Sequence, residues 1–134
     1  MDSLIVENVK ILIAEDNEIN LLLVKKILVK MFPKALIYEA RNGKQAVKIY
    51  KNIPLDIILM DIQMPKKNGY EVTSEIRQLE QSNRTAIIAL TAGILNEEKK
   101  KCLESGMDGY ISKPISPADL QQAILKCLNN KRGG

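Results

Sequence analysis

Residues 57–65 read Ile57-Ile58-Leu59-Met60-Asp61-Ile62-Gln63-Met64-Pro65. Apolar side chains run without a break up to Asp61, and a short run bounded in this way is typical of a strand covered on both faces. A second run, Ile11-Leu12-Ile13-Ala14, ends in the same manner at Glu15-Asp16. Fully covered strands belong to parallel sheets, because the crossover helices lie on both faces. The two stretches therefore predict central strands of a parallel sheet.

Short β-rich segments alternate with segments of helical periodicity on both sides of these runs. The predicted strands are residues 10–14, 36–39, 57–60, 86–90 and 110–111. The predicted helices are residues 18–31, 44–51, 70–81, 97–104 and 117–128. This repeated strand–helix–strand order predicts an α/β fold, a doubly wound five-stranded parallel sheet with five helices on both faces.

The length of 134 residues is near the commonest size of a single domain. We expect one domain over residues 1–134, with its core at about residues 10–128 and flexible ends at residues 1–8 and 129–134. No apolar run approaches the ~20 residues that a membrane helix needs, and the N-terminus does not resemble a secretory signal. Cys102 and Cys127 lack metal-ligand spacing and are expected to be reduced. These features predict a cytoplasmic domain without membrane contact.

The composition excludes several classes of function. The chain contains no histidine, which rules out histidine acid–base catalysis, Ser-His triads and His-ligated zinc within it. It also cannot form phosphohistidine, so any phosphoryl donor of that kind must lie outside these residues. The net charge of +4 comes from lysines spread over several helices. This distribution predicts a solvated basic surface and no direct nucleic-acid binding.

Chemically useful side chains follow the predicted strands. Glu15 and Asp16 follow the first strand, Asp61 the third, Thr91 the fourth and Lys113 the fifth. In a doubly wound sheet, ligands bind beyond the carboxyl ends of the strands. Clustered carboxylates without His or Cys favour Mg²⁺, and a carboxylate can attack phosphorus to form an acyl phosphate. A metal, a lysine and a hydroxyl would supply the charge neutralisation that this transfer needs.

Each of these residues alone has an ordinary alternative. Asp16 or Asn17 could cap the first helix, Thr91 could cap a turn, and Lys113 could be a solvated lysine. Their joint arrangement, with a different residue type at each strand end, favours the functional interpretation.

Five motifs follow one another at these strand ends and in the adjoining loops. They are Glu15-Asp16-Asn17, Leu59-Met60-Asp61-Ile62-Gln63-Met64-Pro65 with Asn68-Gly69, Ala89-Leu90-Thr91-Ala92, Gly106-Met107-Asp108-Gly109-Tyr110 and Ser112-Lys113-Pro114-Ile115. From about residue 10 to residue 128 the chain resembles the response-regulator receiver domain of two-component signalling. The resemblance implies a flavodoxin-like sheet with the strand order 2-1-3-4-5.

The resemblance also implies a phosphorylation site with a bound Mg²⁺. Asp61 would accept the phosphoryl group. Asp16 and Asp61 would ligate Mg²⁺ directly, Glu15 through water, and Gln63 through its backbone carbonyl.

Two further roles belong to the resemblance. Lys113 would pair with the phosphoryl oxygens, aimed by a cis bond to Pro114. Thr91 and Tyr110 would be the switch residues, the hydroxyl moving inward on phosphorylation and the ring following. The surface that changes would be the fourth helix, fifth strand and fifth helix, which could also form a phosphorylation-dependent dimer.

The implied donor is a histidine kinase dimerisation domain or a histidine phosphotransfer protein. The sequences of the first two motifs resemble those in the receiver domains of hybrid sensor histidine kinases. A free-standing regulator is the alternative. On this interpretation the domain is not an enzyme acting on other substrates. It would catalyse only its own phosphoryl transfer and dephosphorylation.

The first helix has more apolar residues than one buried face can use. Helical periodicity predicts a core face formed by Asn20, Leu23, Val24, Ile27 and Met31. Ile19, Leu22 and Val29 then lie on the opposite side among lysines. They are either scattered exposed residues or a docking surface for a helical partner.

Two other functions compete with the phosphorylated switch. A phosphatase could also begin with an aspartyl nucleophile, but it needs a second acid two residues further on, where this chain has Gln63. A degenerate receiver could serve only as a binding module. The intact set of acids, hydroxyl and lysine argues against the second alternative.

Overall fold

The computed structural model describes residues 8–65, 67–80, 84–93 and 96–133. Five parallel strands form one sheet in the order β2-β1-β3-β4-β5, which confirms the predicted topology. The strands are β1 (Lys10–Ala14), β2 (Leu36–Ala40), β3 (Ile57–Asp61), β4 (Ala86–Thr91) and β5 (Gly109–Ser112). The helices are α2 (Glu18–Met31), α3 (Gly43–Asn52), α4 (Gly69–Leu79), α5 (Asn96–Ser105) and α6 (Pro117–Gly133).

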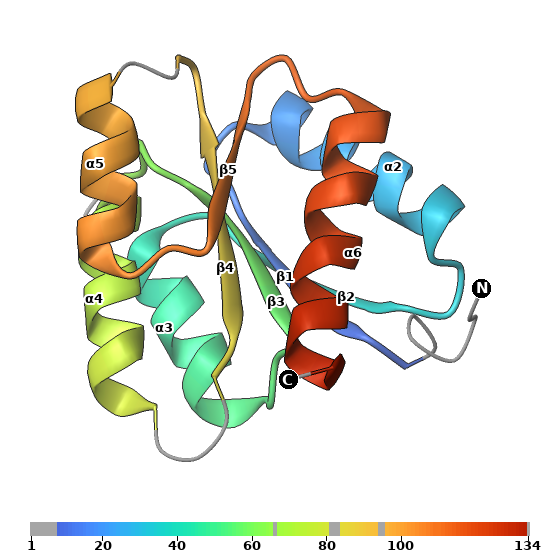
Figure 1. Ribbon diagram of the computed structural model, residues 1–134, viewed down its shortest axis with the longest axis horizontal. Helices are drawn as coiled ribbons and strands as arrows, with labels where there is room; N and C mark the ends of the chain where they lie inside the picture. The colour runs from blue at the N-terminus through green and yellow to red at the C-terminus, as the bar shows by residue number, and fades with distance from the viewer. Residues whose placement is uncertain (1–7, 66, 81–83, 94–95, 134) are drawn as a thin grey trace.

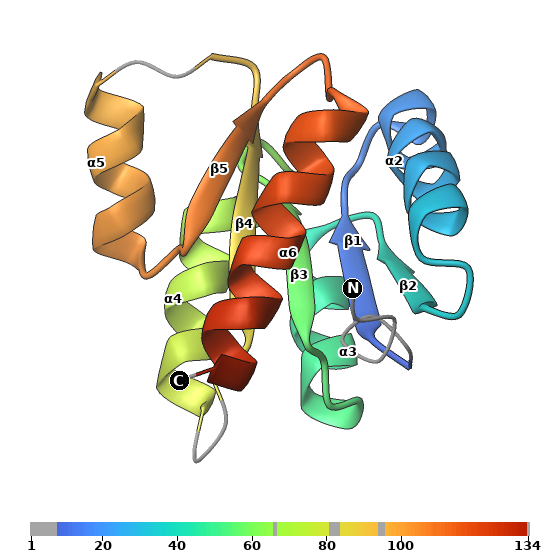
Figure 2. The ribbon, with the colours of Figure 1, turned by 45° about the vertical axis from the view of Figure 1, so that its right-hand side comes forward.

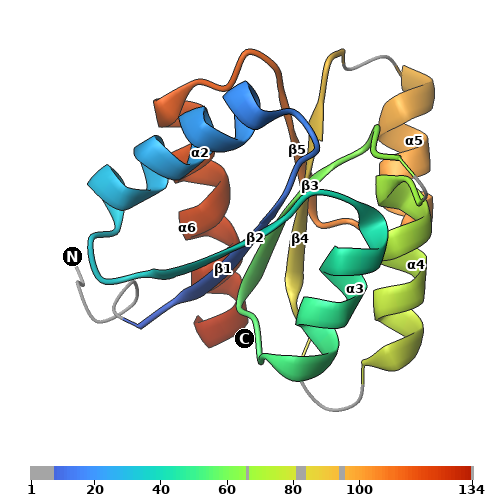
Figure 3. The same cartoon turned by 180° about the vertical axis from the view of Figure 1, so that it is seen from behind.

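The helices form a layer on each face of the sheet, as Figures 1 and 2 show from two directions. Helices α2 and α6 pack on one face around Ile11, Ile13, Leu59 and Leu90. Helices α3, α4 and α5 cover the other face, which is seen from behind in Figure 3. Every residue of β3 and β4 is buried, because both faces of these central strands are covered.

Two helices start at an Asn-Gly pair in which the asparagine is the N-cap. The side chain of Asn42 accepts a hydrogen bond from Gln45 N, and that of Asn68 accepts one from Glu71 N. The Glu71 side chain bonds back to Asn68 N, which completes a capping box at the start of α4. The helix that follows the loop after Asp61 therefore has a well-defined start.

The structure corrects the predicted core face of α2. Leu21, Val24 and Leu28 are buried, whereas Leu23 is exposed. Ile27 and Met31 are only partly buried against this core, and Asn20 is half-buried. The sequence has four apolar residues in succession from Leu21 to Val24, so periodicity does not decide which of them faces the sheet. The packing of the helix against β1 and α6 decides it.

Some element boundaries differ from the predicted ones. Asp61 and Thr91 are the last residues of their strands and are not in the following loops. Helix α6 ends at Gly133 and not at residue 128, so residues 129–133, expected to be flexible, continue the helix. Residues 1–7 of the predicted flexible start, and residue 81 of the third predicted helix, lie outside the described residues. Within the described ranges, none of the helices has the length and apolar character that crossing a membrane requires.

Candidate functional site

Three carboxylates meet at the carboxyl edge of the sheet. Glu15 and Asp16 follow β1, and Asp61 ends β3, whose Met60 is in register with Ala14. One carboxylate oxygen from each acid lies within 4.8 Å of the others. Glu15 and Asp61 are buried, and Asp16 is exposed. Adjacent parallel strands therefore bring together acids that are more than forty residues apart in the sequence.

Lys113 reaches this cluster from the far side of β4. Its backbone N donates a 2.7 Å hydrogen bond to the carbonyl of Thr91, and its peptide bond to Pro114 is cis. The ammonium Nζ lies 3.0 Å from Glu15 Oε1 and 3.4 Å from Asp61 Oδ1. The lysine thus contacts both buried acids, as expected of a neutralising group.

The hydrogen bonds around the acids leave capacity for a cation. Asp61 Oδ1 accepts from Gln63 N at 3.1 Å, and Glu15 Oε2 accepts from Asn17 N at 3.2 Å. Glu15 Oε1 is buried and accepts no hydrogen bond from the described residues, although it forms the ion pair with Lys113. Buried carboxylate oxygens with unused lone pairs match the hard oxygen ligands of Mg²⁺.

The alternative role of Asp16 as a helix cap is not observed. Asn17 is the N-cap of α2, and its side chain accepts from Asn20 N at 3.0 Å. The Asp16 carboxylate is not needed for that cap and lies in the acidic cluster.

The protonation of Asp61 is perturbed by its surroundings. Burial, and after it the neighbouring Glu15 carboxyl, raise the pKa of Asp61 to about 7. The Lys113 ammonium and the Gln63 amide oppose the rise in pKa. Crowded carboxylates of this kind favour either a shared proton or a bound cation.

Thr91 is the last residue of β4, and Tyr110 lies on the adjacent strand β5, opposite Ala89. The Thr91 hydroxyl donates to the Gly93 carbonyl at 2.9 Å and accepts from Gly93 N at 3.3 Å. It caps the turn after β4, and among the described residues its hydrogen bonds go to Gly93. Tyr110 is exposed, with the Lys99 ammonium 5.7 Å from its ring centroid. In this structure the Thr91 hydroxyl is bonded within its own turn and the Tyr110 ring is exposed.

Gly69 is a residue of the site that sequence reasoning treated only as part of a turn. Its N donates a 2.9 Å hydrogen bond to the Ile62 carbonyl. A Cβ atom at this position would lie 2.6 Å from the Asp61 carbonyl oxygen and 2.9 Å from Ile62 Cα. Only glycine allows α4 to start this close to the backbone of Asp61. The Asn68-Gly69 pair was the available signal, but it did not show which backbone the glycine approaches.

The predicted docking residues of α2 are exposed. The exposed fraction is 77% for Ile19, 50% for Leu22 and 51% for Val29. Leu23, which was expected in the core, is also exposed and widens this apolar surface. The four residues are named the α2 stripe below.

Comparison with known families gives one match over most of the chain. Residues 11–125 match the family model described as the response regulator receiver domain. The matched range contains every residue of the acidic cluster, together with Thr91, Tyr110 and Lys113.

A curated relative carries a similar segment within a much longer protein. Hybrid signal transduction histidine kinase G of Dictyostelium discoideum is 44% identical over 119 residues, which is 88% of this chain and 4% of that protein. The chain thus spans a small part of the relative it matches.

Two solved structures are similar in fold and in sequence. The receiver domain of sensor histidine kinase PA1611 from Pseudomonas aeruginosa, with a magnesium ion coordinated in its active-site cleft, has a TM-score of 0.80 and 35% identity, covering 95% of this chain and 99% of that one. The receiver domain of Saccharomyces cerevisiae Ssk1, solved with the histidine phosphotransfer protein Ypd1, has a TM-score of 0.78 and 32% identity. That match covers 93% of this chain and 89% of the other.

Proposed function

Because this chain belongs to the response regulator receiver domain family, we propose that it accepts a phosphoryl group on Asp61 from a phosphohistidine donor and changes its surface in response. One observation carries the proposal: the Lys113 ammonium contacts both buried acids, Glu15 and Asp61, at the edge of the sheet. Phosphoryl transfer to a carboxylate requires a nucleophilic acid and nearby groups that neutralise the transferred charge. Asp61 would be the nucleophile, and Lys113 would supply the positive charge.

The chemistry is a displacement at phosphorus. An Asp61 carboxylate oxygen forms the new bond to phosphorus, and the bond from phosphorus to the donor's histidine nitrogen breaks with its electron pair left on nitrogen. Asp61 must be ionised to attack, and Lys113 favours that form because its positive charge lowers the pKa of Asp61. Lys113 then neutralises charge on the transferred oxygens. Hydrolysis of the same acyl phosphate returns the domain to its starting state.

The acidic cluster fits Mg²⁺ as the resident cation. Asp16 and Asp61 would ligate the ion directly, Glu15 would act through water, and the backbone carbonyl of Gln63 would complete the protein ligands. A bound Mg²⁺ supplies charge neutralisation at the phosphoryl oxygens. The protein's part is to hold the three carboxylates together, which the pairing of β1 with β3 does.

The proposed conformational response to phosphorylation involves two residues, Thr91 and Tyr110. The Thr91 hydroxyl is bonded to Gly93, and Tyr110 is exposed beside Lys99. A phosphoryl group on Asp61 offers the hydroxyl a charged acceptor, and Tyr110 then fills the space that the hydroxyl leaves. We propose that this movement remodels the face of α5, β5 and α6, the fourth helix, fifth strand and fifth helix of the sequence prediction. A dimer of phosphorylated domains would use the same face.

The partner is proposed to be a histidine kinase dimerisation domain or a histidine phosphotransfer protein that docks on the α2 stripe. The stripe is exposed, apolar and bordered by Lys25, Lys26 and Lys30. The parent protein is proposed to be a hybrid sensor histidine kinase, because the Dictyostelium relative is one. The domain would then act in the cytoplasm, without nucleic-acid or membrane contact of its own.

A small phosphodonor with Mg²⁺ tests this function. Incubation with acetyl phosphate should add one phosphoryl group, localised to Asp61 by peptide mass analysis and removed by acid or hydroxylamine. Asp61→Asn should abolish the adduct. A continuous turnover of donor without accumulated adduct would indicate the phosphatase, and the absence of any reaction would indicate a binding module.

A further inference from the structure

Strand β5 carries Lys113 to the acids, but its own sequence specifies its register weakly. It has four residues at the edge of the sheet and buries one side chain, Ile111. A slip of one residue would turn its side chains to the opposite face and move Lys113 by ~3.3 Å. Because Nζ lies 3.0 Å from Glu15 and 3.4 Å from Asp61, either change would break both contacts. Something outside the strand must hold its register.

Asp108, immediately before β5, makes two bonds to one residue of β4. Its backbone N donates to the Ile87 carbonyl at 2.8 Å, and its side-chain Oδ2 accepts from Ile87 N at 2.8 Å. In the register of β4 with β5, in which Ile88 pairs with Gly109, Ile87 stands opposite Asp108, and a regular parallel ladder would send its amide to the carbonyl of Met107. The carboxylate replaces that carbonyl. These two hydrogen bonds hold Asp108 beside Ile87, directly before the first pair of the ladder, Ile88 with Gly109.

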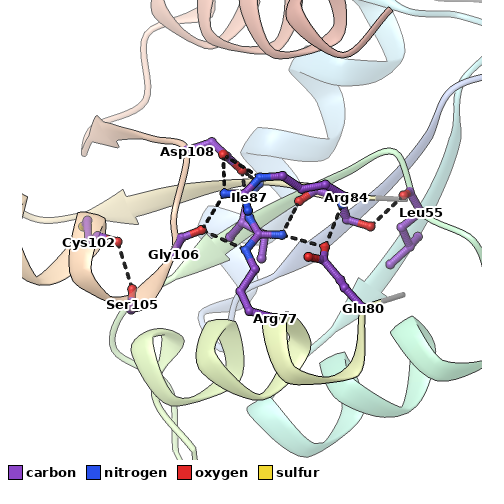
Figure 4. Close-up of polar contacts among 10 residues, drawn as sticks. Leu55, Arg77, Glu80, Arg84, Ile87, Cys102, Ser105, Gly106 and Asp108 are labelled. Atoms are coloured by element: carbon purple, nitrogen blue, oxygen red, sulfur yellow. Dashed lines mark hydrogen bonds and ion pairs between the residues drawn. The ribbon is translucent and has the colours of Figure 1, made fainter. Parts of the chain in front are cut away.

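Arg77 of α4 binds both the Asp108 carboxylate and the carbonyl of Gly106 in the same loop, as Figure 4 shows. Its Nη2 donates to Asp108 Oδ2 at 2.9 Å, and its Nε donates to Gly106 O at 2.9 Å. Its Nη1 bonds to Glu80 at 2.6 Å and to the Thr85 carbonyl at 2.7 Å, at the start of β4. The Arg77 side chain is 14% exposed. A buried, forked set of bonds of this kind fixes geometry more firmly than a surface ion pair.

The backbone conformation of Gly106 and its lack of a side chain allow this contact. Its φ of +102° lies in the left-handed region, and a Cβ there would meet Arg77 Cγ at 3.0 Å. The loop before β5 is therefore built around the arginine side chain.

We propose that Asp108 and Arg77 are positioning residues that set the register of β5 and thereby place Lys113 on Asp61. The inference rests on the proposed function of Lys113 for its effect on phosphorylation. The structural part, that a contact at one end of β5 controls the other end, stands on the hydrogen bonds alone. The Lys113 amide, which donates to Thr91 O, reports that far end directly.

Amide hydrogen exchange followed by NMR tests the structural part. In Asp108→Ala the Lys113 amide should exchange at least roughly tenfold faster, while the amides of Ile13 and Leu59 in the central strands keep their protection. Faster exchange confined to Ile87, with the Lys113 amide unchanged, would overturn the proposal. If Asp108→Ala does not fold, Asp108→Asn keeps one acceptor oxygen for Ile87 and should show a smaller change at Lys113. An unchanged Lys113 amide in that variant would again count against the proposal.

The two arginines provide a matched pair of variants. Arg84 also bonds to Asp108, at 2.8 Å, but its side chain is 57% exposed. Arg77→Gln should speed exchange at Lys113, and Arg84→Gln should alter it by less than roughly twofold, because exposed pairs are weak. Equal effects of the two substitutions would contradict the role given to Arg77.

A double-mutant cycle tests the link to phosphorylation. Asp108→Ala should slow the reaction with acetyl phosphate in the presence of Lys113 and have no further effect in a Lys113→Ala background. Independent, multiplying effects would overturn the link to Lys113. A natural chain that takes up no phosphoryl group would refute the proposed function, and the exchange result would still decide whether Asp108 controls β5.

Discussion

The Lys113 ammonium lies closer to Glu15 than to Asp61, at 3.0 Å against 3.4 Å. Glu15 is fully buried, and its Oε1 accepts no hydrogen bond from the described residues. The Lys113 ammonium therefore compensates the charge of two buried acids at once. The balance of charge at this edge governs the first two predictions.

Mg²⁺ is expected to stabilise the fold through the acidic cluster. At a concentration a hundredfold above its Kd, an ion that binds only the folded chain adds about 2.7 kcal/mol to the free energy of unfolding. Asp16→Asn should lose most of this gain because it removes one of the three clustered carboxylates. Thermal melts with Mg²⁺ and with EDTA measure the effect. Glu104→Gln, which removes an exposed acid of α5, is the control and should keep the full gain.

Without Mg²⁺, stability should fall as the pH rises toward neutrality. The pKa of Asp61 is raised from 3.8 to about 7, so between these pH values the folded chain holds a proton that the unfolded chain has released. The free energy of unfolding must then decrease with pH across this window. Urea titrations in EDTA at several pH values measure this dependence. In Asp61→Asn the decrease in the free energy of unfolding between about pH 4 and pH 7 should be smaller, because the titrating carboxyl is absent. Parallel pH curves for the two proteins would contradict the raised pKa.

Gly69→Ala is expected to destabilise the chain and disturb Asp61. The new Cβ would lie 2.6 Å from the Asp61 carbonyl oxygen, a backbone atom that cannot move aside freely. Overpacking of this kind costs about 1–3 kcal/mol, measurable as a lower midpoint in urea. Gly109→Ala is the matched control, because its Cβ would have no neighbour within 4 Å. Equal losses in the two variants would rule out the close approach as the cause.

Two buried threonines should respond in opposite directions to the same substitution. The Thr73 hydroxyl has no hydrogen-bond partner among the described residues, whereas Thr85 Oγ1 donates to the Leu55 carbonyl at 3.1 Å. Thr73→Val removes an unsatisfied buried group and should raise the free energy of unfolding by about 1 kcal/mol. Thr85→Val leaves a carbonyl without its donor and should lower it by about 1 kcal/mol. Urea unfolding of both variants tests the pair, and a loss at Thr73 would show that its hydroxyl is satisfied.

Leu22→Glu should weaken phosphotransfer from the cognate histidine protein and leave the reaction with acetyl phosphate unchanged. The charge would lie in the middle of the α2 stripe, where an apolar partner surface is proposed to dock. Leu36→Glu, at an equally exposed leucine where β2 begins, is the control. Phosphotransfer rates measured at several donor concentrations separate docking from chemistry. Unaltered transfer to the Leu22 variant would remove the stripe from the docking surface.

Much of the architecture could be predicted because its signals are local. Runs such as Ile57 to Met60 are continuously apolar, so they become central strands whatever lies around them. The acids and the lysine follow such runs, and the carboxyl ends of parallel strands share one edge of a sheet. Sequence position alone therefore placed Glu15, Asp16, Asp61 and Lys113 near one another. The structure places them within contact distance.

Contacts that depend on how helices rotate and approach could not be predicted. Periodicity did not decide between Leu21 and Leu23 as the core residue of α2, because adjacent apolar residues fit several rotations. Nor did it show that Gly69 approaches the Asp61 carbonyl, or that Arg77 meets Asp108 across 31 residues of sequence. The sequence by itself determined the strands, the reactive side chains that follow them, and the edge of the sheet where these side chains gather. Only the packing of α4 against β4 and the loop before β5 decided what holds Lys113 in place, since those contacts join segments that no short-range pattern relates.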